Sequence, residues 1–590
     1  HRQLRRETST IIEKSAGLLA ILIFTSTSTF GQTTFSIEET TIDGIHNAIR
    51  NGDTTCRQVV QSYLERAKAY NGICTQLVTK DGGSVSPSAG TLRNRAALMF
   101  PTTSISINEI LPDYSKYKGL PVELGRMEAT KSDPNAQQQY GMVIGIKNAG
   151  QLNSLSTLNL RGERSITCSK DCDRAPSNGS LPPTCPKKCE KFRQQPDALE
   201  RAAELDAQYG RNPDLDAMPM YCAVLSFKDV FDTTDMRTTS GADVNYAMDT
   251  AARDATVVAA LRAKGAIIYA KANLAEYNAG GGDPGGAKTG KRSFGAGARS
   301  SWAGTACNVY DTTRETGGSS SGSASSVGGN LVSCSICEET GGSCRQPAWR
   351  NGVVGLVTTK GLLPYGGSLG VEPYLDRAGI HCRTVKDTAQ VLDALRNPQG
   401  DYYDPRDIYT ALPKALLPSK PYASFVVQPE TMGAKPLAGI RIGVVREYMV
   451  KHTANDAAMS DLVNNEILNV LRDKLGAELV ESFDPDYPDD PAIPNMDYNF
   501  NRAIAEVLPI HMPEYFQEKD NNGEYKFAVP GYAVTWHDYL VKAAEGKAPL
   551  SDALNLRSIN NSPPTTSFNF HLSQYLLRRG DSRVTDWKSL

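Results

Sequence analysis

An excess of charge of either sign is absent from this sequence. Its 63 Lys and Arg residues nearly balance its 65 Asp and Glu residues, and the formal net charge is −2. Proteins that bind nucleic acid or anionic membranes usually carry strongly basic patches. The composition therefore predicts no nucleic-acid partner and favours a small, uncharged or mixed ligand.

A hydrophobic run long enough to cross a membrane is also missing. The apolar stretch near the N-terminus covers residues 16–24, whereas a spanning helix needs about 20 residues. Basic residues precede this stretch and small residues follow it up to Gly31, which is the order found in cleaved secretory signals. We predict a signal peptide over residues 1–31, an exported (periplasmic or secreted) chain and no stable membrane insertion, with a membrane anchor as the alternative.

Histidine is scarce, with 7 residues in the whole chain, and none lies between Lys228 and Ser343. A Ser-His-Asp triad, which needs a histidine base, therefore has little support. One alternative stays open, because Gly318 to Gly322 matches the G-x-S-x-G elbow of α/β-hydrolases, with His381 as the base. The polar residues before Gly318 disfavour this elbow, since it should follow a strand.

The chain of 590 residues is long enough for one large domain with insertions or for two to three smaller domains. Apolar residues at helical spacing predict two helices over residues 41–70, with a break near Gly52. Residues 257–264 read as a helix, and residues 266–270 and 353–357 read as strands. This alternation predicts an α/β fold with a largely parallel sheet covered by helices.

Four cysteines form two pairs with the same spacing, Cys168 with Cys172 and Cys185 with Cys189. The residues between the pairs are rich in proline and predict a turn between two short arms. Antiparallel arms would join Cys168 to Cys189 and Cys172 to Cys185, and we predict these two disulfides. A four-cysteine zinc site is the alternative, which the oxidising compartment implied by a signal peptide disfavours.

Several other cysteines are expected in the protein core. Cys56 lies on the apolar stripe of the second helix, and the length of that helix keeps it too far from Cys74 for an easy disulfide. We therefore predict a buried thiol at Cys56. Cys334, Cys337 and Cys344 are predicted to be buried as well, with redox activity as the alternative.

Two glycine-flanked serine motifs carry most of the chemical information. The stretch GGSSSGS over residues 317–323 is followed by TGGS over residues 340–343, and Ser343 comes 24 residues after Ser319. Glycines let the backbone adopt strained angles and turn bare N–H groups toward a developing oxyanion. A Gly/Ser linker is the alternative, but apolar sequence follows at residues 352–357. The motifs predict a serine nucleophile with a second serine as proton relay.

With these motifs the chain resembles the amidase signature family, whose hallmark is a glycine- and serine-rich stretch, a second Gly-Gly-Ser at this spacing and an upstream lysine. Lys228, which follows the apolar run AVLSF, fits that lysine. The resemblance covers residues 42–71 and 196–446, about half of the chain, and residues 439–447 resemble a core strand of the family. It implies a mixed, twisted β-sheet wrapped by helices, in an amidase signature domain over residues 40–590.

Three features depart from the family's usual pattern. A large cysteine-containing insertion over residues 80–195 either caps the site or decorates the surface, and the residues leave both possibilities open. Family members usually continue beyond the position matched by Leu590, so we expect the fold to be cut short there. Cys337 and Glu338 stand where the family commonly has a small residue and a threonine, so we expect a different pocket floor.

The resemblance also implies a role for each motif residue. Neutral Lys228 accepts a proton from Ser319, which accepts one from Ser343, and Ser343 attacks an amide carbonyl to form an acyl-enzyme. In the family, the serine matched by Ser319 follows a cis peptide bond. Neither a metal nor an organic cofactor takes part. The backbone N–H groups implied as the oxyanion hole are those of Thr340, Gly341, Gly342 and Ser343.

A second lysine has a similar local pattern. Lys147, like Lys228, follows a strand-like stretch, so the local pattern alone does not choose between them. Only Lys228 precedes a segment that family members share, and Lys147 lies inside the insertion. We therefore predict Lys228 as the base.

The predicted function is that of an exported amidohydrolase that cleaves linear carboxylic amide bonds of small molecules, with esters and carbamates as further candidates. One rival is a catalytically silent secreted binding protein, which the joint presence of Lys228, Ser319 and Ser343 disfavours. The other is a component of an amidotransferase complex, which the predicted export disfavours because that role needs cytosolic partners. The oligomeric state stays open.

Overall fold

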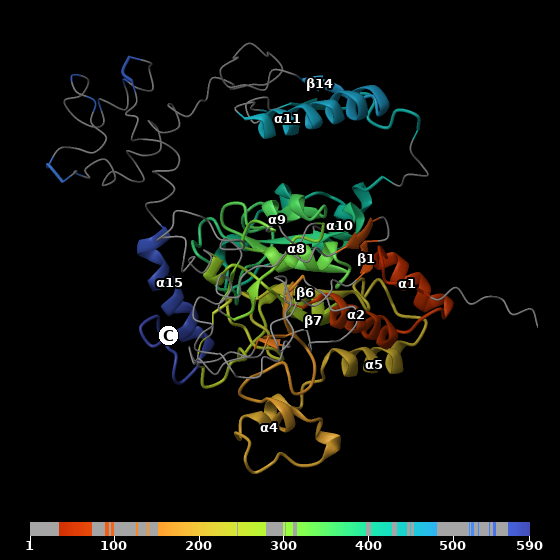
Figure 1. Ribbon diagram of the computed structural model, residues 1–590, viewed down its shortest axis with the longest axis vertical. Helices are drawn as coiled ribbons and strands as arrows, with labels where there is room; N and C mark the ends of the chain where they lie inside the picture. Colours follow the sequence, from red (N-terminus) through yellow and green to blue (C-terminus); the bar gives the residue numbers. More distant parts are fainter. Residues whose placement is uncertain are drawn as a thin grey trace, which may run out of the picture.

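A computed structural model gives the fold of the chain (Figure 1), and it describes only part of the sequence. The signal-peptide prediction, Cys74 and Lys147 fall outside the described residues. Those residues are 35–72, 152–242, 246–278, 302–310, 316–396, 403–427, 433–444, 453–480 and 564–590, with several shorter pieces.

A mixed six-stranded sheet forms the centre of the fold, in the order β11-β12-β10-β6-β7-β5. The pairings of β10 with β6 and of β6 with β7 are parallel, and the other three pairings are antiparallel. The strands are β5 (Leu155–Leu158), β6 (Val224–Lys228), β7 (Ile267–Ala272), β10 (Cys334–Glu339), β11 (Val354–Val357) and β12 (Arg377–Cys382). The α/β fold with a mixed sheet is confirmed, but the prediction of a largely parallel sheet was wrong, because apolar patterning locates strands without giving their direction.

Helices cover both faces of this sheet, and the side chains of β6 alternate between them as a pleated strand requires. Val224 belongs to a hydrophobic cluster shared with α1, α2, α5 and α8. Leu225 and Phe227 belong to a second cluster shared with α6 and α10. These helices are α1 (Ile42–Asn51), α2 (Cys56–Tyr70), α5 (Ala198–Tyr209), α6 (Thr256–Ala263), α8 (Ser321–Gly328) and α10 (Val385–Leu395).

The break between α1 and α2 follows from their caps and confirms the sequence prediction. Gly52 ends α1 with a left-handed φ of 82°, a conformation that glycine adopts without steric cost. Thr55 then begins α2 with a capping box, in which its hydroxyl accepts from the Gln58 N–H and the Gln58 side chain accepts from the Thr55 N–H.

The remaining elements are shorter or lie outside the sheet. β13 falls within the stretch predicted as a core strand, yet it pairs with β14 in a separate two-stranded sheet. The other strands are β1 (Ala89–Arg93), β2 (Ala96–Met99), β3 (Arg126–Met127), β4 (Gln139–Tyr140), β8 (Arg299–Ser300), β9 (Gly304–Thr305), β13 (Arg441–Gly443) and β14 (Glu478–Val480). The other α-helices are α4 (Cys189–Phe192), α9 (Arg345–Arg350), α11 (Ala454–Glu466) and α15 (Pro564–Arg579). Single-turn and irregular helices are η2 (Lys170–Asp173), η3 (Pro176–Asn178), η4 (Glu276–Asn278), η6 (Ile408–Thr410), η7 (Lys414–Leu416), η8 (Tyr422–Phe425) and η11 (Ile467–Lys474).

Two disulfides close the lobe that carries α4, which projects at the bottom of Figure 1. They join Cys168 to Cys189 and Cys172 to Cys185, and the predicted pairing is confirmed. Because all four sulfurs are in disulfides, they are not available as the thiolate ligands that a zinc site requires.

The strand β5 lies within the predicted insertion of residues 80–195, yet it forms an edge of the central sheet. It begins beside the end of α2, where the Leu152 N–H donates to the Tyr70 carbonyl at 3.0 Å. The Asn71 side chain donates to the Leu155 carbonyl and accepts from the Leu155 N–H, both at 2.8 Å. The end of α2 and the start of β5 therefore lie side by side.

Three further disulfides join buried cysteines, and one of them corrects the prediction of a buried thiol at Cys56. Cys56 is buried, but it is joined to Cys222, which lies 166 residues away in the sequence. That distance explains why the prediction was wrong, since only the tertiary fold brings α2 next to the start of β6. Cys334, Cys337 and Cys344 are buried as predicted. They are bonded as Cys334–Cys382 and Cys337–Cys344.

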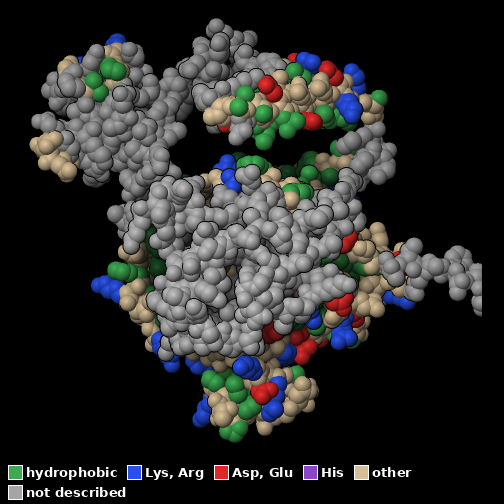
Figure 2. All heavy atoms as spheres, in the orientation of Figure 1, with side chains coloured by type: hydrophobic (Ala, Val, Ile, Leu, Met, Phe, Trp, Pro, Cys, Tyr) green, Lys and Arg blue, Asp and Glu red, His purple; other side chains and the backbone are tan. Residues whose placement is uncertain are grey.

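The surface that can be described carries mixed charge. On the face shown in Figure 2, Lys and Arg side chains are interspersed with Asp and Glu side chains in the described regions. Within the part of the chain that the structure describes, no helix is both long enough and apolar enough to cross a membrane.

Candidate active site

Lys228 ends the central strand β6, and its side chain is fully buried. Its Nζ lies 2.6 Å from the Ser319 hydroxyl, 3.2 Å from the Glu338 carbonyl oxygen and 2.5 Å from Glu338 Oε2. Burial lowers the pKa of Lys228 below its ordinary value, and the Glu338 carboxylate opposes this shift. The structure thus brings together Lys228 and Ser319, as the motifs predicted.

Ser319 lies in a tight loop just before α8. Gly317 and Gly318 have positive φ angles of 71° and 60°, which favour glycine. A Cβ atom at Gly318 would lie 2.6 Å from Pro347 Cδ and 3.0 Å from the Ser343 carbonyl oxygen, so no larger residue fits there. The described residues contain no cis peptide bond, and the cis bond expected before Ser319 is therefore not found. The positive φ angles of the two glycines make the turn instead.

Ser343 lies in the second glycine loop, between β10 and α9, and is half-buried. The Glu339 carboxylate holds this loop, because it accepts from the backbone N–H groups of Cys344 and Arg345 at 3.1 Å each and from Arg345 Nε at 2.7 Å. The two serine loops also meet directly, since the Ser320 N–H donates to the Ser343 carbonyl at 3.1 Å.

Four consecutive backbone N–H groups lie at the turn of this loop. Among the described residues, the N–H groups of this set donate no hydrogen bond to a protein acceptor. They belong to Thr340, Gly341, Gly342 and Ser343. Unpaired N–H groups that point from consecutive residues of a turn form a concavity suited to an anion, so the arrangement can hold a negatively charged oxygen.

The Ser343 hydroxyl itself makes no hydrogen bond to Ser319 in the described part of the chain. The structure therefore shows the contact between Lys228 and Ser319 and places Ser343 on the neighbouring loop. Catalytic hydrogen bonds are often long or absent without substrate.

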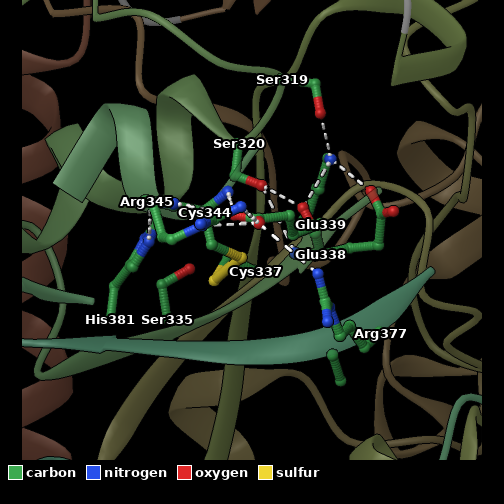
Figure 3. The surroundings of a disulfide bond; sticks show 12 residues. Ser319, Ser320, Ser335, Cys337, Glu338, Glu339, Cys344, Arg345, Arg377 and His381 are labelled. Carbon is green, nitrogen blue, oxygen red and sulfur yellow. Dashed lines mark hydrogen bonds and ion pairs between the residues drawn. A yellow bond between two sulfur atoms is a disulfide. The ribbon is translucent and has the colours of Figure 1, made fainter. Parts of the chain in front are cut away.

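The alternative elbow with Ser320 and His381 is not formed. The Ser320 hydroxyl donates to the Glu338 carbonyl at 2.9 Å, and His381 Nε2 lies 2.9 Å from the Cys344 carbonyl (Figure 3). Burial lowers the pKa of His381 to about 4. His381 therefore pairs with the backbone of the Ser343 loop rather than with a serine hydroxyl.

His381 also lies close to two sulfur atoms, those of Cys337 and Cys344, with all three donor atoms within 4.8 Å of one another. The two sulfurs are joined in a disulfide beside the Ser343 loop (Figure 3). Because a disulfide offers no thiolate, this group does not make a metal site in the oxidised protein.

The family model named Amidase matches residues 189–490, which contain Lys228, Ser319 and Ser343. The chain belongs to the amidase family. The match covers the three central parallel strands and both serine loops, so the family assignment applies to the region that builds the site.

Among curated amidase relatives, a glutamyl-tRNA(Gln) amidotransferase subunit of Aromatoleum aromaticum is 35% identical over 259 residues, which are 44% of this chain and 47% of that protein. The corresponding protein of Cupriavidus necator is 32% identical over 292 residues, 48% of this chain and 52% of that protein. The chain thus spans about half the length of the curated relatives it matches.

Solved amidase structures are also similar. The peptide amidase from Stenotrophomonas maltophilia has 21% identity and a TM-score of 0.43, covering 75% of this chain and 61% of that one. The glutamyl-tRNA(Gln) amidotransferase subunit from Thermotoga maritima has 26% identity and a TM-score of 0.33, covering 44% of this chain and 49% of that one.

Two residues that the sequence analysis did not place in the amidase site belong to its network. The Thr340 hydroxyl donates to Asp376 Oδ1 at 2.6 Å and lies 3.3 Å from Glu338 Oε1. Burial and the charge of Glu338 raise the pKa of Asp376 to about 8. No local signal marks Asp376, because it precedes β12 and meets the site only through strand pairing. The sequence showed that Glu338 departs from the residue type usual in the family, but it did not show that Glu338 contacts Lys228.

Proposed function

We propose that this chain is an amidohydrolase that cleaves linear carboxylic amide bonds of small molecules through an acyl-enzyme on Ser343. The observation that carries the proposal is the 2.6 Å contact between Lys228 Nζ and the Ser319 hydroxyl inside a buried site. A serine hydroxyl is a poor nucleophile until a base removes its proton. A neutral, buried amine next to a serine can remove the proton of that serine, so no histidine is needed as the base.

In the proposed first step, neutral Lys228 takes the proton of Ser319 while Ser319 takes the proton of Ser343. Ser343 Oγ then forms a bond to the amide carbonyl carbon, and the carbonyl oxygen becomes an oxyanion. Burial lowers the pKa of Lys228, which favours the neutral amine that this step needs.

The oxyanion is proposed to bind at the turn of the second glycine loop. The unused N–H groups between Thr340 and Ser343 support this assignment. Each fixed donor of this kind contributes about 3–4 kcal/mol to stabilising such a transition state. Glu339 and Arg345 keep the loop in shape, with Arg345 Nη2 at 2.5 Å from Glu339 Oε1.

In the second half of the reaction, Ser319 gives a proton to the nitrogen of the leaving amine as the carbon–nitrogen bond breaks, and Lys228 returns a proton to Ser319. Water then attacks the acyl carbon while one of its protons passes to Ser319 and the proton of Ser319 passes to Lys228. These protons return by the same path to Ser343 Oγ as its bond to the acyl carbon breaks and the acid is released. Esters and carbamates are further candidate substrates, because their carbonyl groups pass through the same tetrahedral oxyanion.

Amide transfer is the second candidate, because the relatives reported above are named as amidotransferase subunits. It begins with the same acyl-enzyme and differs in the acceptor of the released ammonia. Release of free acid and amine by the isolated chain supports the hydrolase. Cleavage of the amide only in the presence of partner proteins supports the transferase.

Export is part of the proposal. It is supported by the N-terminal pattern of basic, apolar and small residues and by the five disulfides described above, which are typical of oxidising compartments. N-terminal sequencing of the protein from fractionated cells tests it. A mature chain that starts at residue 32 outside the cytosol is expected, and an intact residue 31–32 bond in a cytosolic protein would contradict it.

Labelling with a fluorophosphonate, followed by peptide mass spectrometry, tests the nucleophile. We expect one phosphonyl group on Ser343 in the full chain and none in the Ser343→Ala variant. Ser320→Ala, which removes the hydroxyl of the competing elbow, should still be labelled on Ser343. Modification of Ser320, or of no serine in the folded protein, would overturn the assignment.

A further inference from the structure

We propose that Glu338 is a positioning residue for Lys228: it directs the amine of Lys228 toward Ser319 and sets the pH at which the enzyme becomes active. This inference rests on the proposed function and adds a residue to it. Glu338 stands where the resemblance implies a threonine, so the arrangement belongs to this chain rather than to the family pattern.

The hydrogen-bond geometry around Lys228 Nζ supports this role of Glu338. Its three partners are Glu338 Oε2 at 2.5 Å, the Glu338 carbonyl oxygen at 3.2 Å and the Ser319 hydroxyl at 2.6 Å. A neutral amine has two N–H donors and one lone pair. The Glu338 carbonyl oxygen and Oε2 can only accept hydrogen bonds, so they accept from the two N–H groups of the neutral amine. The lone pair is then left for the Ser319 O–H, as a base requires.

The strand register explains why one residue supplies both acceptors. β6 and β10 are parallel neighbours, and Ile336 of β10 is opposite Phe227 of β6. Glu338 therefore lies beside the end of β6, where Lys228 is located. The side chains of both Lys228 and Glu338 are completely buried, so water does not screen their interaction.

Glu338 is also the carboxylate that compensates the charge of protonated Lys228. The nearby Glu339 is engaged by Arg345 at 2.5 Å and by Arg377 at 3.8 Å. Asp376 is held toward its protonated, uncharged form, because burial and the Glu338 charge raise its pKa. Neither of them replaces Glu338 as the partner of the amine.

The other titratable groups around this pair do not carry a compensating negative charge at neutral pH. His381 on β12 is uncharged, because burial lowers its pKa to about 4. Burial raises the pKa of Tyr365 well above its ordinary value. Lys360 donates to the Asp376 carbonyl and lies over the rings of Tyr365 and Tyr409. Lys228 and Glu338 thus form a charge pair of their own.

A carboxylate at this distance stabilises the protonated amine, so it raises the pH at which Lys228 becomes a base. A nearby opposite charge shifts such a titration by about 1–3 pH units. In Glu338→Gln, which keeps an oxygen acceptor but removes the charge, the pH midpoint of activity should fall by that amount. Glu338→Thr should shift the pH midpoint in the same direction. It should also lower the maximal rate, because the shorter threonine side chain does not place its oxygen where Glu338 Oε2 accepts from Lys228.

The experiment measures the rate of fluorophosphonate labelling of Ser343 against pH in the full chain and in both variants. Asp43→Asn is the matched control, since it also removes one negative charge, from a partly exposed pair with Lys386 at 2.6 Å. Its midpoint should equal that of the wild type. A merely structural role of Glu338 would lower the rate at every pH without moving the midpoint.

A second measurement does not depend on labelling. Protein carrying ¹³C at the lysine ε-carbon is titrated by NMR, and the Lys228 signal is identified by its loss in Lys228→Met. It should titrate at lower pH in Glu338→Gln, while the signal of Lys271, a second buried lysine, stays unchanged. Equal Lys228 titrations in wild type and variants, with Ser343 labelled, would overturn the role of Glu338 alone. Absence of label on Ser343 in the wild type would overturn the proposed function.

Discussion

Lys228 is the residue on which the proposed chemistry depends most directly. Replacing it with Met keeps the length of the side chain but removes the proton acceptor. We expect Lys228→Met to slow acylation of Ser343 by about 10²–10⁴-fold, the usual contribution of a general base. Release of amine from a panel of small linear amides measures this. Lys147→Met should retain activity; the reverse result would refute the choice of base.

The same substitution should also lower stability, because it leaves the Glu338 carboxylate buried without its partner. Breaking a buried pair costs about 3–5 kcal/mol. We expect the double variant Lys228→Met/Glu338→Gln to recover most of that loss in urea unfolding while staying inactive. If the double variant is no more stable than Lys228→Met, the 2.5 Å ion pair does not contribute as described.

The pH dependence of the wild type distinguishes the two candidate bases. Since neutral Lys228 is the reactive form, kcat/KM should rise with pH as Lys228 loses its proton. Burial lowers its pKa and Glu338 opposes that shift, so the rise should lie on the acid side of an ordinary lysine. A rise centred near pH 4 would instead match His381, whose pKa is lowered to about 4.

At the level of elements, the α4 lobe is expected to depend on its disulfides. Its polar core includes the ion pair between Arg164 and Asp173 at 2.9 Å and the stacking of Arg164 on Phe192 at 4.8 Å. A disulfide that closes a loop of this size contributes about 3 kcal/mol. The variant with Cys168→Ser and Cys189→Ser should therefore unfold at lower urea concentration.

Activity at the serine loops should be unchanged in that variant, because none of the described contacts of Lys228 or Ser319 comes from this lobe. Peptide mapping without reducing agent checks the pairing itself. Four free thiols together with one bound zinc ion per chain would restore the zinc alternative.

For the molecule as a whole, α15 joins the C-terminal residues to the central domain (Figure 1). The Tyr575 hydroxyl donates to Asp232 at 2.6 Å. The Arg579 guanidinium donates to the carbonyl groups of Thr238 and Asp249 and lies 4.0 Å from the ring of Tyr246. This anchor ties α15 to the segment that follows Lys228.

Arg579→Met should therefore lower the free energy of unfolding by about 3–5 kcal/mol, because Asp232 loses a nearby positive charge and two carbonyl groups lose their donor. The neighbouring Arg578 is exposed, and Arg578→Met is the matched control with little expected effect. Equal unfolding curves for the two variants would show that α15 does not anchor the domain.

Local features of the amino-acid sequence were sufficient for several parts of this protein. Gly52 and the Thr55–Gln58 capping box, whose partners are three residues apart, determine the break between α1 and α2. The α4 disulfides follow from cysteine spacing, because their loops are short. The contact between Lys228 and Ser319 could be predicted from the resemblance to the family, because the local pattern around Lys228 is shared by Lys147 and does not select it.

Tertiary structure alone decided the features that join distant segments. Cys56 meets Cys222 across 166 residues, and Glu338 meets Lys228 across 110 residues. Both contacts require the order and register of the strands, which depend on how the whole sheet assembles. A hydrophobic pattern reports which residues are buried, but not which neighbour they face. The direction of the strands and the contact between Glu338 and Lys228 therefore had to come from the fold.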